Sequence, residues 1–228
     1  MPAIALVAAG NRLGLALGTL FGRHGFDVAF VARSEERLGE LTGKVAADGI
    51  RAAGFAADVT DRPALAGALE RAADRFDGIE VLHYAAPVAG SSADVRRTGA
   101  VDVTASGVAA QIDSICLGAV AATRAVLPAM LAAGRGTLLY TTGASSVVPT
   151  PMFVGAGMAG AALRRWVLGL ESELADKGIF AGHVAIGAWL AGTPGAPEGA
   201  VLTEPEQVAR RYWDLHVRRE PVDQLVTG

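Results

Sequence analysis

The side chains that could take part in chemistry are few, and they stand where apolar runs of the sequence end. Tyr84 closes one such run, Tyr140 and Thr142 close another, and Ser145 follows shortly after. Phenol and hydroxyl groups at these places could hold or pass a proton. Ser145 has no histidine close to it in the sequence, which argues against a serine nucleophile. For each of the four, a structural role in strand packing or loop capping outweighs a catalytic one.

Metal chemistry and an internal disulfide have no support in the composition. The four histidines lack the spacing of metal ligands, and Cys116 is the only cysteine. The formal net charge is −3 and the paired arginines are scattered, so no basic stripe for a nucleic acid is expected. Apolar residues make up 51% of the 228 residues, which is too many for a disordered chain. The sequence therefore predicts a folded domain without a metal site.

Short apolar runs alternate with amphipathic stretches along the chain. Strands are expected at 3–9, 27–32, 52–57, 81–85, 137–142 and 180–186, with a last one near Leu225. Helices are expected at 13–24, 35–48, 62–76, 104–133, 156–177 and 204–218. Thr203 is the expected N-cap of the last helix, with Pro205 in its first turn, and Pro128 could kink the end of the helix at 104–133.

The order of these elements predicts the fold. Strands whose sequences do not alternate strictly between apolar and polar residues, and that are each followed by a helix, form a parallel sheet covered on both faces. No repeat or linker divides the chain, so residues 1–228 are expected to form one doubly wound, Rossmann-type α/β domain of three layers. In such a fold, ligands bind at the carboxyl ends of the strands. The residues just after each strand are therefore the candidates for a binding site.

The turn after the first expected strand reads Ala-Ala-Gly-Asn-Arg-Leu-Gly from Ala8 to Gly14. Here the chain resembles the short-chain dehydrogenase/reductase family, and the resemblance covers essentially its whole length. The family's turn has the pattern G-x-x-x-G-x-G, which falls on Ala8, Arg12 and Gly14. Ala8 adds only a methyl group, whereas the Arg12 side chain either contacts a phosphate or fills the pocket. The resemblance implies that a nicotinamide cofactor meets Gly10, Asn11, Arg12, Leu13 and Gly14.

Two positions bear on the adenosine half of that cofactor by the same resemblance. Arg33 follows the second strand and favours NADP over NAD, because a basic residue there holds the 2′-phosphate. The alternative is an exposed arginine paired with Glu35 or Glu36. Asp58-Val59 follows the third strand and matches the pair that the family places against the adenine ring, although Asp58 could simply begin a helix.

The resemblance to the family is weaker at the positions that would contact the nicotinamide half of the cofactor. After the fourth strand the family has Asn-Ala-Gly, whereas this chain has Ala85-Ala86-Pro87, so only Ala86 is kept. Thr193-Pro194 matches a family step that touches the nicotinamide. NADP(H) is thus the cofactor that the resemblance implies, and the departures at Ala8, Arg12 and Pro87 leave its binding open.

The family's chemistry uses a tyrosine, a lysine four residues later, a serine and an asparagine. The resemblance places these four at Ala156, Gly160, Gly143 and Ile115, respectively. No shift of the alignment restores the pair, because the three tyrosines are followed four residues later by Val88, Ala144 and His216. The chain therefore contains no Tyr-x-x-x-Lys.

Three functions remain open. The prediction is a divergent member of the family that binds or converts an apolar small metabolite by non-redox chemistry, such as cyclisation, isomerisation or dehydration. The first alternative is an NADP(H)-dependent oxidoreductase or ketoreductase with substitute proton donors, namely Tyr84, Tyr140, Thr142 or Ser145. The second alternative is a non-catalytic subunit that assembles with an active relative.

The expected partners and location follow from the same features. The N-terminus lacks a basic signal-peptide region, and the longest apolar stretches carry charges, so a cytoplasmic protein without a membrane span is expected. The segments 104–133 and 156–177 correspond to the helices that build dimers or tetramers in the family. The resemblance therefore implies a homodimer or homotetramer with a small-molecule ligand.

Overall fold

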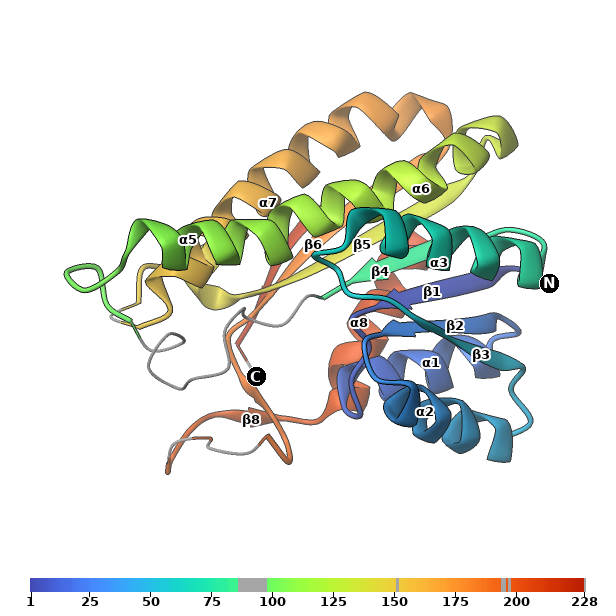
Figure 1. Cartoon of the computed structure of the whole chain (residues 1–228), viewed down its shortest axis with the longest axis horizontal. Coiled ribbons are helices and arrows are strands. Elements are labelled where there is room, and N and C mark those ends of the chain that lie inside the picture. Colours follow the sequence, from blue (N-terminus) through green and yellow to red (C-terminus); the bar gives the residue numbers. More distant parts are fainter. Residues whose placement is uncertain (86–97, 151, 194–195, 197, 228) are drawn as a thin grey trace.

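A parallel sheet forms the centre of the fold. The computed structural model describes residues 1–85, 98–150, 152–193, 196 and 198–227, and within them seven strands lie in the order β3-β2-β1-β4-β5-β6-β9 (Figure 1). Strands that are buried on both faces carry continuous apolar runs, which explains the missing alternation in their sequences. The strands are β1 (Ala3–Val7), β2 (Asp27–Ala32), β3 (Ala52–Ala56), β4 (Val81–Tyr84), β5 (Gly136–Gly143), β6 (Ile179–Ile186) and β9 (Asp223–Val226).

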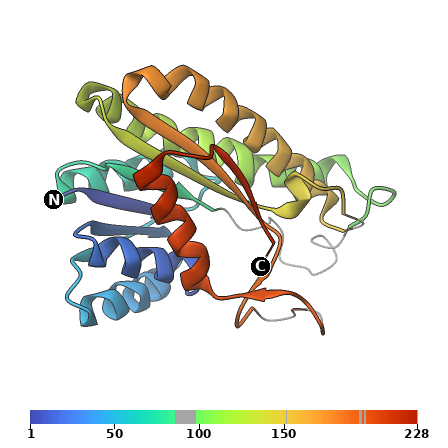
Figure 2. The same ribbon diagram turned by 180° about the vertical axis from the view of Figure 1, so that it is seen from behind.

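Helices cover both faces of this sheet (Figures 1 and 2). One buried cluster joins α3, α6 and α7 to the sheet, and a second joins α1, α2 and α8 to the opposite face. The long helices are α1 (Leu13–Arg23), α2 (Glu35–Ala47), α3 (Arg62–Phe76), α6 (Gly118–Ala133), α7 (Val154–Leu174) and α8 (Pro205–Arg218). The predicted three-layer α/β class is confirmed.

The strand order reverses beside β1. The chain runs outward from β1 to β2 and β3, then crosses to β4 and continues through β5, β6 and β9. Val7 at the end of β1 and Tyr84 at the end of β4 are register partners at this switch point. Crevices at such a point are the usual ligand sites of doubly wound folds.

The structure corrects the helix predicted at 104–133. It consists of α5 (Ala105–Gln111), a π-helical segment (Ile112–Leu117) and α6, and Pro128 lies inside α6. The helical residues 105–133 are also long and apolar enough to cross a membrane, but the core helices of soluble proteins can have the same length and composition. In this fold, α6 covers the sheet beside α3. A π-helical segment shifts the register of backbone hydrogen bonds, which periodicity in a sequence does not reveal.

Smaller differences concern element ends. Thr203 is not the N-cap of α8; that residue is Glu204, and Thr203 lies in β8 (Leu202–Thr203), which pairs with β7 (Trp189–Leu190). The helix predicted at 156–177 begins two residues earlier, with Phe153 in a left-handed conformation before it. The predicted last strand near Leu225 is confirmed as β9.

Candidate functional site

Two adjoining cavities open at the carboxyl ends of the strands, beside the switch point. The first has a volume of about 450 Å³ and lies around the turn before α1. The second has a volume of about 510 Å³ and lies between the ends of β5 and β6 and the start of α7. Their walls share Ala85, Thr141, Ile186 and Leu190. The two cavities together form the candidate site.

The turn between β1 and α1 exposes its backbone to the first cavity. A Cβ atom on Gly14 would lie 3.0 Å from the Ala9 Cα, so close packing of α1 on the end of β1 requires glycine there. A Cβ atom on Gly10 would meet no atom within 4 Å, so the space beside this residue is open. The turn residues assigned to the cofactor all line this cavity: Gly10, Asn11, Arg12, Leu13 and Gly14. This geometry fits the close approach of a diphosphate to bare backbone.

Ala8 occupies a backbone conformation that favours glycine. Its φ angle is +59°, in the left-handed region. We expect Ala8→Gly to raise the free energy of unfolding by about 1 kcal/mol, because the left-handed conformation crowds a Cβ atom. Ala8→Val should lower it by at least as much, because a β-branched side chain suffers more there. Urea unfolding of the three proteins measures both changes, and a less stable Ala8→Gly protein would contradict the expectation.

Arg12 lines the first cavity and leaves its volume open. Its guanidinium donates a hydrogen bond to the carbonyl oxygen of Gly192 at 3.3 Å, just beyond β7. Within the described residues, the first turn of α1 contains no acidic residue and no side chain caps it. The positive end of the helix and the arginine therefore border the same space, which suits an anionic group.

Arg33 pairs with Asp58 rather than with Glu35 or Glu36. Its guanidinium lies 3.8 Å from an Asp58 carboxylate oxygen, and 73% of the Arg33 side chain is exposed. A hydrogen bond from the Thr60 amide is the main cause that lowers the pKa of Asp58, so this carboxylate stays charged. The long distance and the exposure leave Arg33 able to reach a second anion.

The remaining cofactor candidates are placed less favourably. Val59 is buried, and its carbonyl oxygen accepts a hydrogen bond from Arg62 at 2.7 Å. The Thr193 amide donates to Leu190 O at 3.0 Å in the turn after β7. Ala86 lies outside the described residues, as do the neighbouring proline at position 87 and the proline at position 194.

The second cavity collects the four positions that the resemblance assigns to catalysis. Ile115 comes from the π-helical segment, Gly143 from the end of β5, and Ala156 and Gly160 from the first turns of α7. Apolar side chains complete the wall, among them Phe153 and Trp189. The four positions therefore converge on one space, although they present no phenol, amine or hydroxyl group to it.

Tyr84 does not face either cavity. It is fully buried, and its hydroxyl donates to the carbonyl oxygen of Ser114 at 2.5 Å, inside the π-helical segment. A Cβ atom on Gly118 would lie 2.1 Å from this hydroxyl oxygen. Burial raises the pKa of Tyr84 above its ordinary value, which makes it a poor proton donor at neutral pH. The position indicates that Tyr84 anchors the segment that carries Ile115.

Tyr140 is buried in the same way. Its hydroxyl lies 2.6 Å from the Thr123 hydroxyl, and its ring meets Trp166 edge to face. Burial raises the pKa of Tyr140 as well. Of the four candidate donors, only Thr142 and Ser145 line the second cavity.

A chain of polar contacts that the sequence did not suggest begins at Thr142. The Thr142 hydroxyl lies 2.7 Å from the Ser146 hydroxyl and 2.8 Å from Nε2 of His183. The other ring nitrogen of His183 lies 2.7 Å from a carboxylate oxygen of Asp223. The second Asp223 oxygen accepts from Nε of Arg164 at 2.9 Å. These five side chains come from β5, β6, β9, α7 and the short turn after β5.

A second buried group, also unforeseen, borders the first cavity on the other face of the sheet. Nε2 of His83 lies 2.9 Å from the Thr141 hydroxyl, which lies 2.5 Å from the hydroxyl of Tyr212 on α8. Burial lowers the pKa of His83 to about 3, so the ring is neutral across the physiological range. This group supplies polarity without charge beside the turn that carries Gly10.

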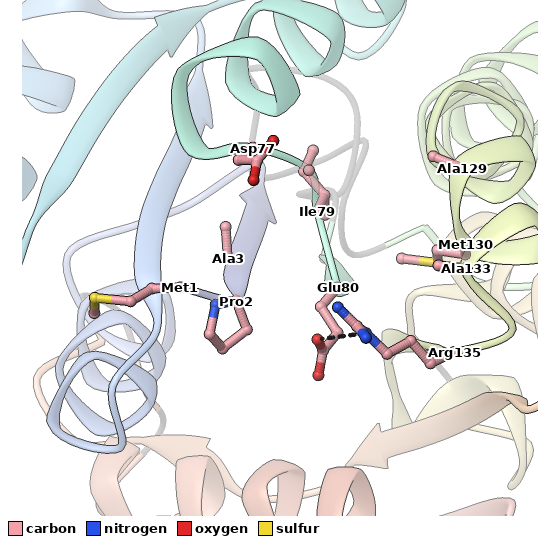
Figure 3. A pocket seen from close by; sticks show the side chains of 11 residues that line it. Met1, Pro2, Ala3, Asp77, Ile79, Glu80, Ala129, Met130, Ala133 and Arg135 are labelled. Atoms are coloured by element: carbon pink, nitrogen blue, oxygen red, sulfur yellow. Dashed lines mark hydrogen bonds and ion pairs between the residues drawn. The ribbon is translucent and has the colours of Figure 1, made fainter.

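A third hollow, of about 420 Å³, lies at the opposite end of the sheet (Figure 3). It opens at the amino ends of β1 and β4, between Met1, Asp77 and the end of α6. Glu80 and Arg135 form an ion pair of 3.2 Å across it, drawn as the dashed line in Figure 3. It is remote from the switch point and is not part of the candidate site.

Comparisons with known proteins agree with this geometry. A family model described as short chain dehydrogenase matches residues 3–195, and the chain belongs to this family. It is 30% identical to the A-factor type gamma-butyrolactone 1′-reductase (1S-forming) of Streptomyces virginiae, over 86% of this chain and 78% of that protein. It is 25% identical to the glycine betaine reductase ATRR of Emericella nidulans over 95% of this chain, which spans 17% of that longer protein.

A solved structure gives the same fold. The 3-oxoacyl-[acyl-carrier protein] reductase of Brucella melitensis with bound NAD matches with a TM-score of 0.86 at 18% identity, over 100% of this chain and 90% of that one. Identity at this level shows the fold alone. The two relatives named above are reductases, and the chain's family is described as short chain dehydrogenase, which suggests a nicotinamide cofactor as the type of ligand.

Proposed function

We propose that this protein is an NADP(H)-dependent oxidoreductase that interconverts a carbonyl and an alcohol on an apolar small molecule. The observation that carries the proposal is the pair of adjoining cavities at the switch point, one bordered by the glycine-containing turn and the other by apolar walls. Their shared border at Thr141 and Leu190 allows one extended ligand and one small substrate to meet.

Three positive groups support the phosphorylated cofactor. Arg12 and Arg37 line the first cavity, and Arg33 stands exposed at the end of β2. Guanidinium groups match the geometry of phosphate oxygens and form charge-assisted hydrogen bonds with them. A cofactor with an additional phosphate would form more charge-assisted hydrogen bonds with these guanidinium groups than a cofactor without it.

The lining of the second cavity supports an apolar, uncharged substrate. Among the described residues, its wall contains Ile115, Phe153, Ile186 and Trp189, and the polar side chains that border it are hydroxyls. When bound, the nicotinamide would exchange a hydride with the substrate carbon. Thr142 is the side chain best placed to hold the proton at the substrate oxygen, because it lines the cavity and belongs to a polar chain.

Hydride transfer is the direct test of this function. The protein is mixed with NADPH that carries deuterium on the transferred position and with cyclohexanone, acetophenone and decanal. Mass spectrometry then measures deuterium in the alcohol products. Deuterated alcohol supports the proposal, whereas a protein that binds NADPH and produces none from any probe contradicts it.

Arg33 should determine the preference between the two cofactors. We expect Arg33→Ala to weaken NADPH binding about tenfold, or about 1.4 kcal/mol, and to leave NADH binding unchanged. Arg23→Ala is the matched control, because Arg23 is also an exposed arginine in an ion pair, here with Asp48. Fluorescence titration of the wild type and both variants gives the six dissociation constants, and an equal loss for both cofactors in Arg33→Ala would overturn the assignment of Arg33.

A specific observation also supports non-redox chemistry as a second candidate. The positions of the family's reactive groups carry Ile115, Gly143, Ala156 and Gly160, and no Tyr-x-x-x-Lys exists in the chain. A protein without that set could use the same apolar cavity for cyclisation, isomerisation or dehydration, or serve as a non-catalytic subunit. Binding of NADPH without deuterium transfer would favour these candidates.

We further propose a homodimer or homotetramer and a cytoplasmic location. Apolar side chains are exposed on the outer helices, including Leu131 on α6 and Met158 on α7, at 41% and 50% exposure. Pairing of such helices between copies would bury them. Light scattering on the purified protein tests the assembly, and cell fractionation tests the location.

A further inference from the structure

Three neighbouring strands bring Thr142, His183 and Asp223 into line beneath α7. β5, β6 and β9 are parallel and adjacent, and His183 and Asp223 are register partners. His183 Nε2 lies 2.8 Å from the Thr142 hydroxyl, and Nδ1 lies 2.7 Å from Asp223. The order hydroxyl, imidazole, carboxylate is the arrangement in which a buried acid orients a histidine and the histidine exchanges a proton with the hydroxyl.

The chemistry of the groups fixes which atom donates in each hydrogen bond from Asp223 through His183 and Thr142 to Ser146. A carboxylate only accepts, so Nδ1–H of His183 donates to Asp223. In a neutral ring Nε2 is then an acceptor, so the Thr142 hydroxyl donates to it and the Ser146 hydroxyl donates to Thr142. If the ring gains a proton, both bonds reverse, and Ser146 donates to the Gly143 carbonyl oxygen at 2.9 Å. Each N–H and O–H group of His183, Thr142 and Ser146 therefore has an acceptor whether the ring is neutral or protonated.

The charged groups around His183 are few within the described residues. Asp223 faces it from β9 and favours the protonated ring, whereas the more distant Arg164 on α7 opposes it. β5 presents the neutral Thr142 hydroxyl. Burial is the largest effect and lowers the pKa of His183 below its ordinary 6.5. The ring is consequently neutral at pH 7, with Nε2 ready to accept a proton.

Gly160 lies against the Ser146 and Thr142 side chains, and the space between them fits a residue without a side chain. A Cβ atom on Gly160 would lie 2.9 Å from Ser146 Cβ and 3.4 Å from Thr142 Cβ. A lysine at this position, where the resemblance places one, would bring its Cβ atom too close to Ser146 Cβ. Neither Cβ atom can move away by side-chain rotation, because each is bonded directly to the backbone. Gly160 leaves room for the Ser146–Thr142 contact at the border of the second cavity.

We propose that Thr142, backed by His183 and Asp223, forms the proton relay of the second cavity and takes the place of a tyrosine and lysine. The inference rests on the proposed oxidoreductase activity. Thr142 is the residue that touches the substrate oxygen. His183 acts through Thr142 as a positioning residue that stores the proton, and Asp223 holds the ring in its Nδ1–H form, itself held by Arg164.

Oxidation of an alcohol in this site moves one proton and one hydride. The substrate O–H bond breaks and its proton passes to Thr142 Oγ1, while the Thr142 proton passes to His183 Nε2. The carbonyl double bond forms as the C–H bond breaks, and the electron pair leaves as hydride to NADP⁺. His183 becomes an imidazolium paired with Asp223, and the proton later returns to solvent. Reduction of a carbonyl runs through the same bonds in reverse.

The first test measures the protonation of His183 without any substrate. Nitrogen NMR of the ¹⁵N-labelled full chain at pH 7.5 should show His183 neutral and protonated on Nδ1. Thr142→Val should change the Nε2 signal because it removes the hydrogen-bond donor. A ring protonated on Nε2 at this pH would overturn the relay, because Nε2 could not then accept the Thr142 proton.

The second test uses the pH dependence of turnover with NADP⁺ and cyclohexanol, benzhydrol or decanol as probes. The kcat/KM of oxidation should be level above the pKa of His183 and fall as the pH drops below it, because protonation removes the acceptor. We expect His183→Gln to lower kcat/KM about 100-fold and to abolish this acidic decline. Thr142→Val should match that loss, and Thr142→Ser should restore most of the rate.

His216→Gln is the matched control. His216 is a half-buried histidine that also contacts a threonine hydroxyl, Thr137 at 2.9 Å, but at the amino end of β5. Its replacement should leave the pH profile unchanged. A wild-type protein that oxidises no probe would overturn the proposed function and the relay together. A His183→Gln protein that keeps the wild-type pH profile would overturn the relay alone.

Discussion

Replacing Gly118 by alanine is expected to lower the free energy of unfolding by about 3 kcal/mol, the upper end of the cost of overpacking a core. The new Cβ atom would lie 2.1 Å from the hydroxyl oxygen of Tyr84 and 3.0 Å from the carbonyl oxygen of Val59. The Tyr84 side chain has no room to move, because it is fully buried and its hydroxyl is bonded to Ser114 O, and the Val59 carbonyl oxygen is held by a hydrogen bond from Arg62. Urea unfolding measures the loss.

A double-mutant cycle attributes this loss to one contact. Tyr84→Phe alone should cost about 1 kcal/mol for the lost hydrogen bond. In the Tyr84→Phe protein, Gly118→Ala should cost much less, with a coupling of about 2 kcal/mol between the two sites. Gly169→Ala in α7 is the control, since a Cβ atom there meets nothing within 4 Å. Additive effects of Gly118→Ala and Tyr84→Phe would show that the loss in Gly118→Ala does not come from contact with the Tyr84 hydroxyl.

Replacing Gly10 by leucine is expected to weaken NADPH binding at least about 100-fold, or about 2.7 kcal/mol. Gly10 lines the first cavity, and its Cβ position faces open space there. A leucine side chain would occupy the volume that the diphosphate needs. Because Gly10 has no left-handed φ angle and no close neighbour, the midpoint of urea unfolding should not fall.

Gly43→Leu in α2 is the matched control for this substitution. A Cβ atom on Gly43 also meets nothing within 4 Å, but the residue lies outside the walls of the first cavity. Its NADPH affinity should equal that of the wild type. If Gly10→Leu bound NADPH as tightly as Gly43→Leu, the cofactor would have to bind elsewhere.

Most of the fold could be predicted because its signals are local. β1 and β2 are fully buried and therefore read as continuous apolar runs, and the helices between strands show their own periodicity. The π-helical segment and the two-residue strands β7 and β8 could not be predicted in this way. The first changes only the hydrogen-bond register within an apolar helix, and the others are too short for a pattern.

The candidate site was predictable to a smaller extent, for the same physical reason. The turn from Ala8 to Gly14 is continuous in sequence, so its position beside a ligand follows from one strand and one helix. The relay joins residues 142, 183 and 223, which only the order and register of three strands bring together. Tyr84 ends β4 as expected, whereas β5 continues past Tyr140 to Gly143, and the sequence does not tell which strand face meets the cavity.

Binding of NADP(H) at the switch point is the central claim, and a titration of the unmodified protein with NADPH and with NADH, followed by chemical unfolding, tests this binding most directly. We expect NADPH at a hundredfold excess over its dissociation constant to raise the free energy of unfolding by about 2.7 kcal/mol. NADH at the same concentration should raise it less, because it lacks the phosphate that the arginines would hold. No stabilisation by either cofactor at millimolar concentration would contradict an NADP(H)-dependent oxidoreductase.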